Sequence, residues 1–113
     1  MQALDANTIR ELREMLGDEL DELFAEFIQL VPAELEQIQQ CMQQGDLTSI
    51  EHKVHQIKGS AANLGVVAFA AGCKELEEGL RSGDITEPGS YVEEIHNLFE
   101  QASSEIKKLG PAL

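Results

Sequence analysis

The sequence predicts an all-α protein, an antiparallel four-helix bundle with a short N-terminal lid helix. Apolar residues recur at the three- and four-residue spacing of a helix face, whereas alternating runs typical of strands are nearly absent. Only three prolines occur, and the glycines fall mostly at segment ends. The chain has 113 residues and shows no internal repeat or low-complexity linker, so we expect one domain over residues 1–113.

A short first helix is expected near the N-terminus, beginning at about Asn7 or Thr8 and stopping at Gly17. Thr8 and Glu11 have the spacing of a capping box, in which two side chains satisfy backbone N–H groups of the first turn. Its apolar residues share one face, as expected for a helix that covers the bundle as a lid: Ile9, Leu12 and Leu16.

The second helix is expected to be the longest. Asp18 can cap its start, and its apolar series keeps its spacing straight through Pro32. We therefore predict one helix, kinked at Pro32 and ending near Gly45, with a break at the proline as the alternative. The series consists of Leu20, Phe24, Phe27, Val31, Leu35, Ile38 and Met42.

Three further helices follow the same pattern and are joined by short loops. The third begins near Leu47 and stops at Gly65, and the fourth begins near Val66 and stops at Gly83. The last opens at Pro88, a residue that suits the first turn of a helix. Their stripes are Leu47, Ile50, Val54, Ile57, Ala61 and Leu64; Val66, Phe69, Cys73, Leu76 and Leu80; and Val92, Ile95, Phe99, Ala102, Ile106 and Leu109.

The charge balance excludes several classes of protein. With 8 basic and 21 acidic residues, the net charge of −13 argues against binding to nucleic acid or to an anionic membrane. No apolar stretch approaches the ~18 residues of a membrane span, and the N-terminus lacks a signal-peptide pattern. Cys41 and Cys73 lack C-x-x-C spacing, which argues against a disulfide framework or a zinc site. We expect a cytoplasmic protein, and Met1 favours a free-standing chain, expected to be monomeric.

The third helix carries the residues with the most distinctive chemistry. At ~100° per residue, His55 lies roughly 130° from the centre of the apolar stripe and should face solvent. Lys58 follows one turn later, while Gly59 and Ala62 leave the surface beside the imidazole nearly bare. A glycine inside a helix costs roughly 1 kcal/mol relative to alanine. Close packing within the molecule or close approach of a partner's backbone could compensate for Gly59.

An exposed histidine of this kind suits phosphoryl transfer. An ordinary imidazole titrates near pH ~6.5, so a neutral and nucleophilic nitrogen is available at cytoplasmic pH. Such a nitrogen can attack an acyl phosphate and hold the phosphoryl group as a phosphoramidate. Lys58 is placed to offset the incoming negative charge, and the bare flank lets another protein dock over His55.

These residues resemble the histidine-containing phosphotransfer (HPt) domains of bacterial phosphorelays. The resemblance rests on two motifs, His55-x-Ile57-Lys58-Gly59-Ser60-Ala61-x-x-Leu64-Gly65 and Cys73-x-x-Leu76-Glu77-x-x-x-Arg81. It implies a phosphohistidine at His55, with Lys58 and Gly59 as its first supports. It also implies receiver domains or a hybrid sensor kinase as partners, with Mg²⁺ on the receiver and no cofactor on this chain.

Hairpin geometry extends the site to the fourth helix. If the chain folds back about residues 65–66, positions that sum to about 132 lie side by side. His55 then faces Glu77, and Lys58 faces Lys74. A carboxylate that accepts a hydrogen bond from Nδ1 would fix the imidazole and leave Nε2 free, which makes Glu77 a candidate ring orienter. Half of the basic residues fall in this hairpin: Lys53, Lys58, Lys74 and Arg81.

The family has a glutamine or a similar acceptor in the orienting role, and Glu77 departs from this pattern by adding a charge. Arg81, one turn beyond Glu77, and Lys74 are further candidates for the site, with ordinary surface charge as the alternative. Docking of a partner is expected on an apolar rim beside His55, formed by Ala62, Val66 and Val67.

Two rival functions come from other classes. A di-metal bundle needs two Glu-x-x-His motifs, but only Glu93-x-x-His96 fits, since His52 stands where a second glutamate would be required before His55. A helical adaptor that binds receiver or kinase domains without phosphorylation would have lost the acceptor histidine or the Lys-Gly pair, and both are present. The sequence offers no Gly-rich nucleotide loop, so we expect a phosphocarrier without kinase activity.

Overall fold

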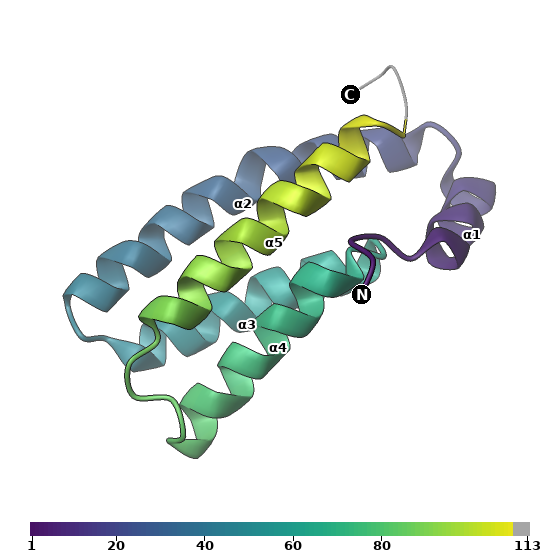
Figure 1. Ribbon diagram of the computed structural model, residues 1–113. Coiled ribbons are helices and arrows are strands. Elements are labelled where there is room, and N and C mark those ends of the chain that lie inside the picture. Colours follow the sequence, from purple (N-terminus) through teal and green to yellow (C-terminus); the bar gives the residue numbers. More distant parts are fainter. Residues whose placement is uncertain (110–113) are drawn as a thin grey trace.

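Five helices and no strand make up residues 1–109, the part of the chain that the computed structural model describes (Figure 1). The prediction of an all-α protein is confirmed. The helices are α1 (Ala6–Leu16), α2 (Glu19–Gln43), α3 (Leu47–Asn63), α4 (Val67–Ser82) and α5 (Gly89–Lys107).

The four long helices form an elongated antiparallel bundle of 42 × 22 × 19 Å. Contacts join α2 to α3, α3 to α4, α4 to α5 and α5 back to α2, so each long helix packs against two others. Figure 1 shows the α2–α3 and α4–α5 connections at one end of the bundle and α1 at the opposite end. No helix of the described part is long and apolar enough to cross a membrane.

The start of α1 differs from the predicted capping box. Asp5 is the N-cap: its carboxylate accepts hydrogen bonds from the Asn7 backbone N–H at 3.2 Å and from the Thr8 hydroxyl at 2.6 Å. Thr8 therefore lies inside the helix, and the proposed pairing with Glu11 is wrong, because a carboxylate three residues earlier already satisfies the first turn. Asp18 occupies the N-cap position of α2, but its side chain makes no capping hydrogen bond.

The second helix runs without interruption through Pro32, which excludes the alternative of a break there. The apolar residues on both sides of the proline explain why the helix persists. Val31 is 3% exposed and Leu35 is 4% exposed, so the packing of this face opposes the loss of one backbone hydrogen bond at Pro32.

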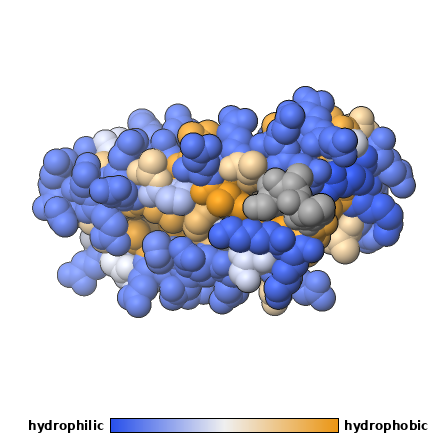
Figure 2. Space-filling model, turned by 90° about the horizontal axis from the view of Figure 1, so that it is seen from above, coloured by the Kyte–Doolittle hydropathy of each residue, from blue (hydrophilic) through white to orange (hydrophobic). Residues whose placement is uncertain are grey.

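The predicted stripes form the core. Three phenylalanine rings from α2, α4 and α5 meet at its centre, with centroids 5.8–6.1 Å apart: Phe27, Phe69 and Phe99. Leu47, Met42 and Leu80 are only partly buried, at the ends of their stripes. The assignment of Leu109 to the core is wrong, since it follows the end of α5 and is 40% exposed. Figure 2 shows a largely hydrophilic face with hydrophobic residues along its middle.

A tight turn joins α3 to α4. Gly65 has a φ of +74°, a conformation that side chains disfavour, and the Val66 N–H returns to the carbonyl of Ala61 at 2.9 Å. This is a Schellman arrangement, which ends a helix and reverses the chain. A methyl group on Gly65 would also lie 3.2 Å from the Thr8 side chain, and the Gly65 carbonyl accepts the Asp5 N–H at 2.9 Å. The turn thus anchors α1 as well.

Two glycines of α4 are close-packing positions. A Cβ on Gly72 would lie 2.7 Å from the Leu98 side chain, and one on Gly79 would overlap Ile85. Because both residues lack a side chain, α5 and the α4–α5 loop can approach the backbone of α4 closely.

Candidate functional site

His55 lies in the middle of α3 with its side chain 62% exposed. The residues on either side of it along the apolar stripe, Val54 and Ile57, are 0% and 4% exposed. The helical periodicity that buries those two side chains therefore turns the imidazole outward, as the sequence predicts.

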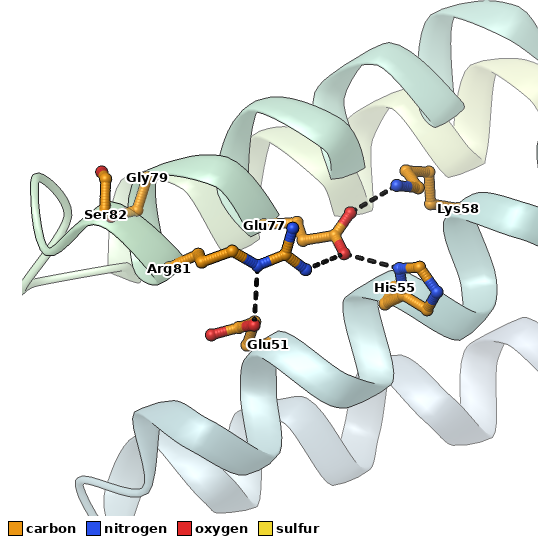
Figure 3. Close-up of polar contacts among 7 residues, drawn as sticks. All are labelled: Glu51, His55, Lys58, Glu77, Gly79, Arg81 and Ser82. Carbon is orange, nitrogen blue, oxygen red and sulfur yellow. Dashed lines mark hydrogen bonds and ion pairs between the residues drawn. The ribbon is translucent and has the colours of Figure 1, made fainter.

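Glu77 lies directly across from His55 on α4. Its side chain is only 2% exposed, and its Oε2 atom is 2.5 Å from the Nδ1 atom of His55 (Figure 3). An ionised carboxylate can only accept hydrogen bonds, so Nδ1 carries a proton, and in the neutral ring the lone pair is on Nε2. Figure 3 shows that the second ring nitrogen points away from Glu77. The register predicted for the hairpin thus places a buried acceptor behind an exposed ring.

Lys58 and Arg81 also converge on Glu77. The Lys58 Nζ atom lies 2.5 Å from Oε1, and the Arg81 Nη2 atom lies 2.8 Å from Oε2. Arg81 extends further to α3, where its Nε atom donates to Glu51 at 3.2 Å. The buried carboxylate therefore accepts from three side chains, two on α3 and one on α4 (Figure 3).

These contacts keep Glu77 ionised despite its position. Burial raises the pKa of this carboxyl, but hydrogen bonds from Lys58 and His55 outweigh burial and hold the pKa below its ordinary value of 4.5. The neighbouring thiol of Cys73 behaves in the opposite way. Burial and the negative charge of Glu77 raise its pKa to about 12, so Cys73 is a protonated core residue and not a nucleophile.

The remaining basic residues of the hairpin lie elsewhere. Lys53 turns toward α2, where it donates to Gln37 at 2.5 Å and lies 3.8 Å from Glu34. Lys74 is exposed and lines a separate depression on α4 together with Glu75. Of the four basic residues that the sequence brings to this hairpin, the structure places two, Lys58 and Arg81, at Glu77.

Gly59 faces open space. A Cβ built on this residue would meet nothing within 4 Å, so packing inside the molecule does not require a glycine at this position. Ala62, two turns from His55 toward the end of α3, is exposed and leaves the same side of the helix bare.

The prediction that Val66 belongs to the docking rim is wrong. Val66 is 0% exposed, because the residue that follows the glycine of a Schellman turn points back onto the helix that has just ended. Val67 is half-buried and Ala62 is exposed, so these two residues remain at the surface.

A larger apolar groove lies beside the site and escapes sequence reasoning. Leu12 and Leu16 of α1, Leu30 of α2, and Gln56 and Ser60 of α3 contribute to its walls. Leu30 is 55% exposed there. Because residues of three helices, α1, α2 and α3, line the groove, no pattern within one helix reveals it.

The other two histidines have different surroundings. His52 is exposed on α3. On α5, the Nε2 atom of His96 lies 3.9 Å from Glu100, four residues further along the same helix. Within residues 1–109, no three His, Cys, Asp or Glu side chains are grouped so that they could hold a metal ion.

The fold and the site define a class of helical bundle that presents one exposed histidine from the middle of a helix, against a buried carboxylate of the next helix. The Hpt domain family matches residues 22–105, which is most of the chain. The chain therefore belongs to the Hpt domain family, whose role is phosphotransfer in two-component signalling.

Two proteins of Pseudomonas aeruginosa resemble the chain. Sensor histidine kinase AruS is 24% identical over 109 residues, an alignment that covers 96% of this chain but only 11% of the kinase. The crystal structure of histidine-containing phosphotransfer protein B (HptB) superposes with a TM-score of 0.88 at 29% identity, covering 94% of this chain and 92% of the other. The chain thus covers most of the HptB chain but only about a tenth of the kinase.

Proposed function

We propose that this chain is a phosphorelay intermediate that accepts a phosphoryl group on His55 from the aspartyl phosphate of a receiver domain and passes it to another receiver domain. One observation carries the proposal: the imidazole is exposed, and a buried carboxylate 2.5 Å from Nδ1 leaves Nε2 free for attack. The likeness to HptB, a histidine-containing phosphotransfer protein, supports it.

The transfer is a displacement at phosphorus. The lone pair of Nε2 forms the N–P bond while the P–O bond to the aspartyl carboxylate breaks, and the carboxylate leaves with that electron pair. Positive charge develops on the imidazole during this step. Glu77 accepts the Nδ1–H bond and offsets that charge, so its ionised state favours the phosphorylated ring. Reversal of the same step passes the phosphoryl group onward.

Lys58 is the candidate partner of the phosphoryl oxygens. It lies one turn from His55 with its side chain 27% exposed, so the ammonium can turn from Glu77 toward an incoming phosphate. Gly59 provides clearance, since no side chain stands between this part of α3 and a docked protein.

The receiver would supply what this chain does not need to carry. In this proposal the aspartate and the Mg²⁺ belong to the receiver, and the chain acts without a cofactor or kinase activity of its own. Free thiols at Cys41 and Cys73 fit a reducing compartment, and we place the carrier in the cytoplasm.

Docking is proposed over Ala62, Val67 and the neighbouring apolar groove. The groove continues from Gln56 and Ser60 on α3 to the exposed Leu30 on α2, so one partner could cover it and His55 together. Burial of such an apolar surface would stabilise the complex while the bare flank at Gly59 admits the reacting groups.

The test is transfer of ³²P from labelled receiver domains to the wild type, to His55→Gln and to the control His96→Gln. We expect acid-labile, base-stable label on the wild type and on His96→Gln, and background label on His55→Gln. Equal label on His55→Gln would move the acceptor to another residue. Binding of a receiver without label on any of the three proteins would favour the adaptor function instead.

A further inference from the structure

One oxygen of Glu77 serves two donors. Oε2 accepts both from His55 Nδ1 at 2.5 Å and from Arg81 Nη2 at 2.8 Å, whereas Oε1 accepts from Lys58. The orientation of the carboxylate that His55 meets is therefore set by two cations, one on each side. Rotation of the carboxylate away from the imidazole would break both of these contacts as well.

The two cations differ in how they are held. Beyond Glu77, Lys58 makes no other ion pair within residues 1–109. Arg81 is fixed at both ends, because its Nε atom donates to Glu51 on α3 while its Nη2 atom donates to Glu77 on α4 (Figure 3). The hydrogen bond with Glu51 and the negative charge of Glu77 raise the pKa of Arg81, which stays charged throughout.

We propose that Arg81 is a positioning residue: it keeps the Glu77 carboxylate aimed at His55 when Lys58 turns away from Glu77 to the phosphoryl group. The second half of this statement rests on the proposed function, and the first half does not. Without Arg81, departure of Lys58 would leave a side chain that is 2% exposed with His55 as its only partner among these groups.

The charges around Glu77 support this assignment. The groups that face it are His55 and Lys58 on α3 and Arg81 on α4, with the protonated thiol of Cys73 one turn earlier. Glu51 completes the cluster through Arg81, so two carboxylates balance two permanent cations while the imidazole is neutral. When Lys58 turns to a phosphoryl group, Arg81 therefore remains as a cation bonded to Glu77.

An arginine suits this position better than a lysine would. Its planar guanidinium presents separate N–H groups to two carboxylates at once, whereas an ammonium is a single point of charge. A lysine at position 81 could reach Glu77 or Glu51 but would not bridge them with the same fixed geometry. The variant Arg81→Lys therefore separates the contribution of the positive charge from that of the bridging geometry.

The first experiment needs no phosphate and no partner. The ¹⁵N shifts of the His55 ring report which nitrogen carries the proton, and the wild type should show the Nδ1–H form. We expect Arg81→Gln to lower the share of the Nδ1–H form and Arg81→Lys to restore part of it. The control is Arg10→Gln, which should leave the share unchanged, because the Arg10 side chain donates to Asn7 on α1.

The second experiment uses phosphoramidate as a small donor: Nε2 bonds to phosphorus, the P–N bond breaks, and ammonia leaves with a proton from water. Arg81→Gln should slow phosphorylation of His55 about 2- to 10-fold, the range of one net hydrogen bond. In a Glu77→Gln background, the same substitution should cause no further loss, because its target carboxylate is gone.

Two results would overturn the proposal. One is an unchanged His55 tautomer in Arg81→Gln, and the other is an equal loss of rate with and without the Glu77 carboxylate. Both differ from failure of the proposed function, in which the tautomer changes as expected but no receiver transfers its phosphoryl group to the wild type.

Discussion

Two histidines of this bundle stand beside a glutamate, and only one pair is built into the fold. His55 and Glu77 join α3 to α4 at 2.5 Å, with the glutamate side chain 2% exposed. His96 and Glu100 lie on one helix at 3.9 Å, with side chains 56% and 64% exposed. In the second pair, water screens the charges and both side chains are free to turn, so the contact contributes little.

The difference between the two pairs shows what fixes the orientation and the tautomer of a histidine ring. A carboxylate on the same helix surface cannot fix a ring, whereas a carboxylate held in the interior by other cations can. The packing of two helices therefore supplies the orientation, and the surface of one helix supplies only proximity.

The largest effect is expected from removal of the Glu77 carboxylate. Glu77→Ala should lower the free energy of unfolding by about 1.5–3 kcal/mol, the range for hydrogen bonds to a charged group. The cost stays in this range because Lys58 and Arg81 are partly exposed and can turn to solvent. Urea unfolding of Glu77→Ala and of the control Glu100→Ala would measure the difference.

Glu100→Ala should change the free energy of unfolding by less than about 0.5 kcal/mol, as is usual for an exposed substitution. Equal losses in the two variants would show that burial of Glu77 adds nothing to its contacts, and the comparison between the two pairs would fail.

Acid should weaken the wild type through Glu77. The folded-state pKa of this carboxyl lies below its ordinary value of 4.5, so its stabilising contribution is complete above that pH. The contribution is lost as the pH falls through the folded-state pKa, with a slope of at most about 1.4 kcal/mol per pH unit for one group. Unfolding curves of the wild type and Glu77→Gln, recorded from pH 7 downward, test this directly.

The difference in the free energy of unfolding between the wild type and Glu77→Gln should become smaller as the pH falls. Asp21 and Asp46 also have lowered pKa values, through hydrogen bonds with Arg13 and Ser49, but they are present in both proteins and cancel in the difference. A gap that stays constant down to the acid-unfolding region would contradict the ionised state of Glu77.

A small gain in stability is expected at Gly59, one of two helical glycines at which an added Cβ would meet open space. Gly59→Ala should raise the free energy of unfolding by about 0.5–1 kcal/mol, because alanine favours a helix interior and its methyl group meets nothing within 4 Å. The same variant should slow phosphoryl exchange with a receiver. Gly89→Ala, at the first residue of α5, is the control for function, since that position is also open but lies away from His55.

Thermal unfolding gives the stability of both variants, and the rate of ³²P transfer gives their function. If Gly59→Ala exchanged phosphoryl groups as fast as Gly89→Ala does, a docking role for the bare flank would be excluded.

Much of the fold could be predicted because helical spacing records burial directly. The stripes that place Val54, Ile57 and Leu76 inside also place His55 outside, and the hairpin register brings Glu77 to it. The contact between Glu51 and Arg81 obeys the same register, although Glu51 is not among the residues predicted for the site.

Other features depend on contacts that no single helix encodes. The sequence places Val66 both in the apolar stripe of the fourth helix and on the docking rim, and the turn decides for the core, because the direction of the side chain follows from the φ of Gly65. Lys53 and Lys74 share the hairpin with Lys58, but a long flexible side chain goes to whichever neighbour is in reach, and for Lys53 that neighbour lies on α2. Tertiary placement, and not sequence spacing, decides these cases.

The short turn at Gly65 also fixes the register between α3 and α4. His55 and Glu77 are 22 residues apart, and the number of residues between them decides which face of α4 is turned toward His55. One residue inserted into α4 between the turn and Glu77 would rotate the Glu77 side chain by about 100° about the helix axis and point it away from the imidazole. We therefore expect changes of length to be tolerated far better in the α4–α5 loop, which lies outside this interval, than between His55 and Glu77.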